Sequence, residues 1–147
     1  MTFFMAQAIA EAERAAARGE VPVGAVLVEA TSGRVLAAAG NRTRELGDPT
    51  AHAEMMVIRA VRRAALQRCD LYVSLEPCAM CAAAISLARI RRLYFGAYDP
   101  KGGAVDHGPR WFGQATCLHR PEVYGGIEER RAGEVLRRFF ATLREGD

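Results

Sequence analysis

Apolar residues near the start of the chain recur every three or four positions. They are Met5, Ala8, Ile9, Ala12 and Ala16, and charged residues lie between them. This spacing is typical of an amphipathic helix, which we expect over residues 5–17 and which Gly19 would end.

Short runs of β-branched and aromatic residues predict strands. Two such runs, 25–28 and 35–39, lie on either side of a turn-forming Thr31-Ser32-Gly33, so a hairpin is expected. Two further strands are expected over 71–75 and 92–97. Between and after them, helical patterns cover 51–65, 77–88 and 127–144.

The alternation of strands and helices predicts an α/β sandwich with helices on both faces of the sheet. A long segment, 99–120, is rich in Gly and Pro and has no clear period. Within it, we expect Trp111 and Phe112 to pack back onto the body of the protein.

Composition indicates one globular domain covering residues 1–147, because the length suits a single core and half of the residues are hydrophobic. The first twenty residues contain Glu11, Glu13, Arg14 and Arg18, so they predict neither a signal peptide nor a membrane span. Four cysteines suit a reducing compartment, and a cytoplasmic location without membrane attachment is expected.

Positive charge is concentrated in the middle of the chain. Between Arg42 and Arg120 there are twelve basic and seven acidic residues, although the net charge of the whole protein is only +3. Two arginine clusters, 59–68 and 89–92, contribute most of this excess. Each fits equally well a solvated helix face or contact with nucleic-acid phosphates.

The strongest chemical signal is His52-x-Glu54 followed by Pro77-Cys78-x-x-Cys81. One imidazole and two thiolates can hold a zinc ion and leave its fourth position open, as in catalytic zinc sites. Glu54 is then free to move protons. Side chains two residues apart diverge by about 200° on a regular helix, so the metal must lie beyond the helix N-terminus.

Simpler interpretations of the cysteines exist. Cys78 and Cys81 could form a redox pair, or a structural zinc site in which Cys69 or Cys117 supplies another thiolate. Neither interpretation accounts for Glu54 and Pro77. The combined His-x-Glu and Pro-Cys-x-x-Cys signature is that of zinc-dependent nucleobase deaminases.

Nearly the whole chain resembles the bacterial tRNA-specific adenosine deaminases. The resemblance is carried by the segments 20–26, 41–42, 49–54, 75–81, 95–97, 99–104 and 139–140. It implies a cytidine deaminase-like three-layer αβα sandwich with a central mixed sheet of about five strands, one Zn²⁺ per subunit and a homodimer. The implied reaction is hydrolytic deamination of adenosine to inosine at the wobble position of the tRNA-Arg(ACG) anticodon, with release of ammonia.

The resemblance also implies roles for individual residues. His52, Cys78 and Cys81 correspond to the zinc ligands and Glu54 to the proton shuttle. Contacts to the tRNA anticodon stem-loop are implied for Asn41, the Ala53 main chain, Asp99, Lys101, Gly103, Phe139, Phe140 and Arg144. For the two phenylalanines, a place in the core is the favoured interpretation.

Two other functions remain compatible with these residues. One is deamination of a free nucleobase or nucleoside, such as guanine, cytosine or adenosine, on the same fold. The other is a non-catalytic, zinc-stabilised RNA-binding module. Substrate assays separate the first from a tRNA deaminase, and substitution of Glu54 separates the second.

Overall fold

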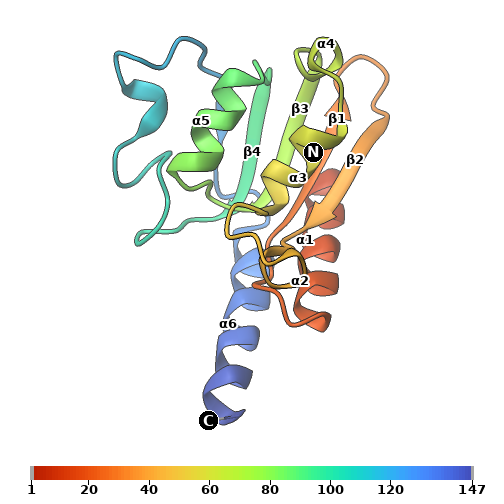
Figure 1. Cartoon of the computed structure of the whole chain (residues 1–147), viewed down its shortest axis with the longest axis vertical. Helices are drawn as coiled ribbons and strands as arrows, with labels where there is room; N and C mark the ends of the chain where they lie inside the picture. Colours follow the sequence, from red (N-terminus) through yellow and green to blue (C-terminus); the bar gives the residue numbers. More distant parts are fainter. Residues whose placement is uncertain (1, 147) are drawn as a thin grey trace.

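Five strands form one mixed sheet in the computed structural model, which describes residues 2–146 (Figure 1). Along the sheet the order is β2-β1-β3-β4-β5. The strands are β1 (Gly24–Glu29), β2 (Val35–Gly40), β3 (Cys69–Leu75), β4 (Arg92–Ala97) and β5 (Glu122–Tyr124). The three inner strands are almost completely buried, which explains why they appear in the sequence as continuous apolar runs.

The direction of pairing changes across the sheet. β1 is antiparallel to β2, as the hairpin prediction requires, and also to β3, whereas β3, β4 and β5 are mutually parallel. The parallel step from β3 to β4 passes through helix α5 (Ala79–Leu87). Strand β5 lies beyond the irregular 99–120 segment, and the sequence patterns did not predict it because only three residues take part.

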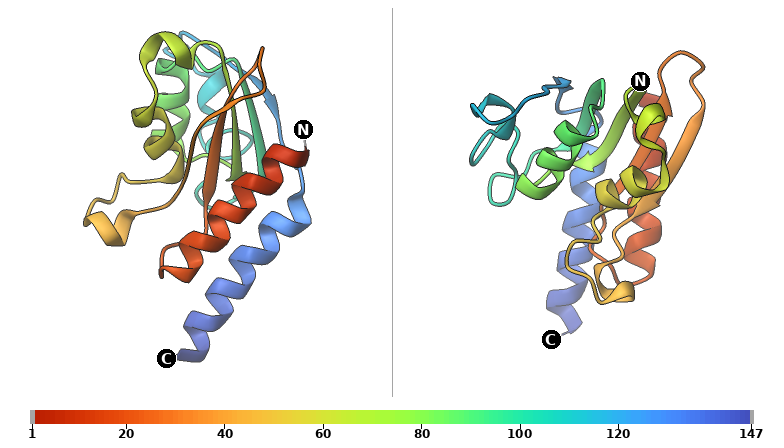
Figure 2. Two further views of the ribbon diagram at one scale, coloured as in Figure 1. Left: turned by 90° about the vertical axis from the view of Figure 1, so that its right-hand side faces the viewer. Right: turned by 45° about the horizontal axis from the view of Figure 1, so that its top comes forward.

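Helices cover both faces of the sheet, as predicted. On one face, α1 (Thr2–Ala17) and α6 (Glu129–Gly146) contact each other and run side by side in the same direction (Figure 2). On the other face lie α3 (Ala53–Ala60) and α5. Two single-turn helices, α2 (Thr43–Leu46) and α4 (Arg63–Leu66), lie in the connections before and after α3.

Two glycines allow α1 to pack directly on the β1–β2 hairpin. A Cβ atom at Gly24 would overlap the Ala8 carbonyl oxygen and the Ala12 amide nitrogen of α1. At Gly40, which pairs with Gly24, a Cβ atom would lie 2.9 Å from the Ala15 Cβ atom. This close approach fixes the end of the hairpin that leads to Asn41.

The two helices that carry the candidate metal ligands differ from the prediction at their ends. The helix expected over 51–65 ends at Ala60, because Val61 and Arg62 adopt extended backbone angles before α4 begins. The helix expected from Pro77 begins at Ala79, and Cys78 is its N-cap residue, with extended angles. His52 is likewise the N-cap residue of α3 and lies outside its first turn.

The 99–120 segment packs as predicted. It contains a 3-10 helix, η1 (Trp111–Gly113), in which Phe112 is buried in the core between the sheet and α5, and Trp111 packs against the same cluster. None of the helices in residues 2–146 combines the length and the apolar character needed to cross a bilayer.

Candidate active site

Four chain segments meet at one edge of the sheet. β3 and β4 are parallel and end there at Leu75 and Ala97. Because β1 is antiparallel to β3 and β2 is antiparallel to β1, the start of β1 and the end of β2 lie at the same edge. The residues that follow β2, β3 and β4 and those that precede β1 therefore surround a common space.

The candidate metal ligands come from the N-termini of two helices. His52 caps α3, Cys78 caps α5, and Cys81 is the third residue of α5. The donor atoms of these three residues all lie within 4.8 Å of one another. No other cluster of three potential ligands occurs within residues 2–146, and Cys69 and Cys117 are not brought to this site.

The distances between these donors suit zinc. The Nδ1 atom of His52 lies 3.6 Å from the Cys78 sulfur and 3.5 Å from the Cys81 sulfur. Tetrahedral coordination with bonds of about 2.3 Å to sulfur and about 2.0 Å to nitrogen requires a nitrogen–sulfur separation of roughly 3.5 Å. The residues present therefore fit one zinc ion, and one coordination position is left for water.

The two thiols differ in their affinity for a proton. The hydrogen bond from Cys81, together with His52, lowers the pKa of Cys78 to about 4. The same hydrogen bond and burial raise the pKa of Cys81. A thiolate is thus favoured at Cys78 at neutral pH, whereas metal binding has to displace the proton held by Cys81.

Glu54 is buried beside the three candidate ligands, with only 3% of its surface exposed. Burial, together with the nearby Cys78 thiolate, raises the pKa of its carboxyl group to about 7. A carboxyl group with a pKa near the working pH can both accept and release a proton, which is the property that a proton shuttle requires.

A cavity of about 340 Å³ opens next to these residues. Its size is at the lower end of the range for small-molecule sites. The lining residues are Val21, Val23, Asn41, Thr43, His52, Glu54, Leu75, Glu76, Cys78, Asp99 and Gly102. His52, Glu54 and Cys78 therefore share one pocket with apolar side chains that can cover the faces of a flat ring.

Asn41 joins the end of β2 to the start of α3. Its side-chain oxygen accepts a hydrogen bond of 2.8 Å from the Ala53 amide. The backbone amide of Asn41 donates to the Val23 carbonyl, and the backbone amide of Arg42 donates to the Ala51 carbonyl. Because the side-chain oxygen of Asn41 is engaged by the Ala53 amide, the side-chain NH₂ group of Asn41 is the part that is available to the cavity.

A second, larger groove of about 790 Å³ adjoins the cavity and shares Val21, Leu75 and Asp99 with it. Its other lining residues are Tyr98, Lys101, Leu136, Arg137, Phe140, Ala141 and Arg144. Three basic and two aromatic side chains thus line this groove. Phe140 is 41% exposed, so a core position is wrong for this residue.

Three residues implied to touch RNA line neither the cavity nor the groove, and one of them is Ala53, which is completely buried between His52 and Glu54. Phe139 lines a separate groove between α6 and the end of α1. Gly103 is buried beneath its own loop and lines neither the cavity nor the groove. These residues therefore line neither the cavity nor the groove, although Gly103 contacts Asp99 and Phe139 contacts Phe140.

The arginines of the 89–92 cluster are partly engaged in ion pairs. Arg91 donates two hydrogen bonds to Asp70, and Arg92 forms an ion pair with Glu122. Both pairs lie at the start of β3 and β4, opposite the cavity. For these two arginines, this arrangement favours a role in surface ion pairs over contact with nucleic-acid phosphates.

Sequence reasoning assigned no role to Glu20 and Glu76, although both are buried carboxylates next to the cavity. Glu20 accepts hydrogen bonds from the Thr43 hydroxyl and from the Arg44 and Glu45 amides. It thereby fixes α2, which follows Asn41. A charged residue beside an apolar strand is the only sequence signal for either carboxylate.

We expect Glu20→Gln to lower the free energy of unfolding at pH 7 by roughly 1–3 kcal/mol, because an amide cannot accept all of these hydrogen bonds. Burial raises the pKa of Glu20, but the hydrogen bonds from Arg44, Glu45 and Thr43 outweigh burial and lower it below its usual 4.5. The carboxylate therefore stabilises the fold above this value, and the contribution is lost as the pH falls through the lower folded-state pKa. Urea unfolding of both proteins at pH 7 and at pH values below 4.5 tests this, and a difference that does not shrink in acid would contradict it.

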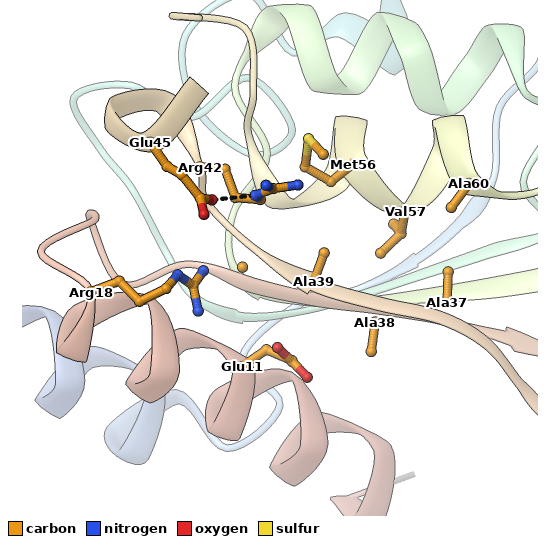
Figure 3. A pocket seen from close by; sticks show the side chains of 11 residues that line it. Glu11, Arg18, Ala37, Ala38, Ala39, Arg42, Glu45, Met56, Val57 and Ala60 are labelled. Atoms are coloured by element: carbon orange, nitrogen blue, oxygen red, sulfur yellow. Dashed lines mark hydrogen bonds and ion pairs between the residues drawn. The ribbon is translucent and has the colours of Figure 1, made fainter. Parts of the chain in front are cut away.

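A separate hollow of about 460 Å³ lies on the side of the hairpin, between α1, β2 and α3 (Figure 3). Its charged residues include Arg42 and Glu45, which form an ion pair, and Arg18 and Glu11. It contains no candidate metal ligand and none of the residues predicted to act on a substrate. The chemistry therefore belongs to the cavity beside Glu54.

Comparison with known proteins bears on both the fold and the site. The family model for the cytidine and deoxycytidylate deaminase zinc-binding region matches residues 1–97. A tRNA-specific adenosine deaminase of Agrobacterium fabrum (strain C58) is 59% identical over 150 residues, covering 99% of this chain and 97% of the relative.

Solved structures agree. One from work on A-to-I editing by tRNA:A34 deaminases at the wobble position of transfer RNA has a TM-score of 0.88 at 59% identity, covering 92% of this chain and 100% of that chain. A guanine deaminase from Nitrosomonas europaea has a TM-score of 0.79 at 24% identity, covering 95% and 84% of the two chains, and shows the fold alone. The predicted αβα sandwich with five strands is confirmed.

Proposed function

The chain belongs to the zinc-dependent cytidine and deoxycytidylate deaminase family and, within it, to the tRNA-specific adenosine deaminases, and from this premise we propose that it converts adenosine to inosine at the wobble position of a tRNA anticodon. The proposed substrate is the tRNA-Arg with the anticodon ACG. Water is the second substrate, and ammonia leaves.

His52, Cys78 and Cys81 would hold the zinc ion of this family. When bound there, zinc supplies Lewis-acid activation of a water molecule for attack on C6 of adenine. A carboxylate oxygen of Glu54 accepts the proton that the water molecule loses. Glu54 delivers this proton to N1 of the ring, then takes the second proton from the new hydroxyl group on C6 and passes it to the departing amino group. The water oxygen therefore stays on C6 as a carbonyl, and ammonia is released.

Other residues would bind and orient the nucleoside. Asn41 has its side-chain oxygen committed to Ala53, so its NH₂ group is the part available to a ribose or base oxygen or nitrogen. Val21, Val23 and Leu75 offer apolar surfaces to the purine ring. A wobble base is already unpaired in the anticodon loop, and its entry into the cavity therefore costs little unpairing energy.

The observation that carries the choice of substrate is the groove that continues the cavity at Asp99. Lys101, Arg137 and Arg144 can approach phosphates, and Tyr98 and Phe140 can stack on flanking bases. A free nucleobase would fill only the smaller cavity and leave this groove without a role. The groove therefore supports an oligonucleotide as the substrate over a free base.

The decisive experiment measures inosine in an arginine tRNA anticodon stem-loop that carries adenosine at the wobble position. Zinc-loaded protein should convert this RNA, and a stem-loop with guanosine at that position serves as the control. A panel of free adenosine, guanine and cytosine is assayed in parallel. Turnover confined to the small molecules would refute the proposal in favour of a free-base deaminase.

The remaining expectations are proposals of the same kind. We propose a homodimer from the family resemblance, and sedimentation of the zinc-loaded protein tests it. Because tRNA is the substrate, the cytoplasm is the proposed location. Residues 1–147 are proposed to act as one deaminase domain, since α1 and α6 both pack on the sheet that positions the site.

A further inference from the structure

Glu76 is a buried carboxylate whose side chain forms several hydrogen bonds to a single segment of the chain. It lies between β3 and Cys78, and it is 2% exposed. One carboxylate oxygen accepts from the Asp99 amide at 3.0 Å and lies 2.8 Å from His107 Nδ1. The other accepts from the amides of Val105, Asp106 and His107 at 3.1, 2.9 and 3.2 Å.

All five of these bonds end in the loop 99–107. This loop is also closed on itself, because the Gly103 amide donates to the Asp99 carbonyl and the Asp99 side chain accepts from the amides of Lys101 and Gly102. One further bond, from the Ala104 amide to the Pro77 carbonyl, ties the loop to the segment before Cys78. Glu76 thus holds both ends of a loop that has no regular secondary structure.

Close packing at Gly103 shows how tightly the loop fits. A Cβ atom there would lie 2.5 Å from the Asp99 carbonyl oxygen and 2.5 Å from the Glu76 carboxyl carbon. Only glycine therefore lets the loop reach the carboxylate. The role of Gly103 is accordingly to permit this contact, which explains why it is buried away from the groove.

The loop forms part of both binding spaces. Asp99 and Gly102 line the cavity, and Asp99 and Lys101 line the groove. Neither Glu76 nor the loop supplies a candidate metal ligand. A carboxylate that fixes this loop therefore sets the shape of the RNA-facing surface without taking part in proton transfer.

We propose that Glu76 is a positioning residue that fixes the 99–107 loop as the substrate-binding wall and thereby sets affinity for RNA. The inference rests on the proposed function. Its signature is a change in KM at nearly constant kcat, because the binding surface is altered while Glu54 and the zinc ligands stay in place.

The test compares Glu76→Gln with Asp70→Asn. Glutamine has the same shape, but its NH₂ group cannot accept from backbone amides. Asp70 is a matched buried carboxylate, bonded to Arg91 at the opposite end of β3. For Glu76→Gln we expect KM for the stem-loop to rise roughly tenfold, with kcat within about threefold of wild type and full zinc content. Asp70→Asn should leave both constants within about twofold, whatever its effect on thermal stability.

A second variant and a second measurement keep the inference testable if Glu76→Gln does not fold. His107→Ala removes one bond to Glu76 and should raise KM by roughly threefold. In a Glu54→Gln background, the dissociation constant of the stem-loop should rise with Glu76→Gln as KM does. A loss of kcat at unchanged KM, or no change in either constant, would overturn the inference. An inert wild type would instead refute the proposed function.

Discussion

Glu54→Gln is expected to lower kcat for tRNA deamination by at least about a thousandfold, because the amide cannot carry protons between water and the departing amine. The buried carboxyl group has a pKa raised to about 7, so it is partly neutral at the working pH, and glutamine is its isosteric neutral counterpart. The fold and the dissociation constant of the RNA should therefore change little.

Three measurements check this expectation: single-turnover kinetics, zinc content, and RNA binding by fluorescence anisotropy. The matched control is Glu11→Gln, a carboxylate paired with Arg14 on α1 and remote from the cavity, which should retain full turnover. Near-normal kcat in Glu54→Gln would exclude Glu54 as the proton carrier. Equal inactivity of the wild-type protein would favour the non-catalytic RNA-binding module.

Cys81→Ser is expected to remove the metal. Serine is close in size to the completely buried cysteine, but its hydroxyl group is a poor zinc ligand at neutral pH, and zinc content should fall from about one per chain to nearly none. Deamination should become undetectable. The melting temperature should fall as well, since binding of the metal to the folded chain stabilises it.

Cys69→Ser and Cys117→Ser are the matched controls, because both thiols are buried but bond to the carbonyl groups of Ala65 and His119, away from the site. Elemental analysis of the purified proteins gives the zinc content of all three. Loss of zinc in either control would restore the alternative in which one of these cysteines supplies a fourth thiolate.

The parts of the fold that depend on local spacing were predictable. The period of Met5, Ala8 and Ile9 identified α1, and the apolar run at 71–75 identified β3. The candidate ligands were predictable for a related reason: imidazole and thiolate side chains in the His52, Cys78 and Cys81 pattern have few other uses in combination.

The parts that depend on distant partners were not. Strand β5 forms because residues 122–124 pair with the edge of β4. Three residues are too few to show the alternation by which a strand is predicted from sequence. The hydrogen bonds of Glu76 cross 23 to 31 residues of chain. The sequence shows its carboxylate but not the loop that satisfies it, and the same holds for the division of Phe139 and Phe140 between two grooves.

The bonds around Asn41 have a consequence for how this enzyme can diversify. Asn41 and Arg42 are hydrogen-bonded to Val23, Ala51 and Ala53. These bonds hold the two ends of the 43–50 segment together just before His52 and form a neck. Leu46 and Gly47 are exposed and lie beyond this neck and beyond the segment that Glu20 holds, whereas the Thr50 carbonyl accepts a hydrogen bond from the His52 amide. We therefore expect insertions next to Gly47 to lengthen a surface loop without moving the imidazole. Evolution, or a protein engineer, can therefore append new surface sequence at this point while the geometry of the metal site is kept.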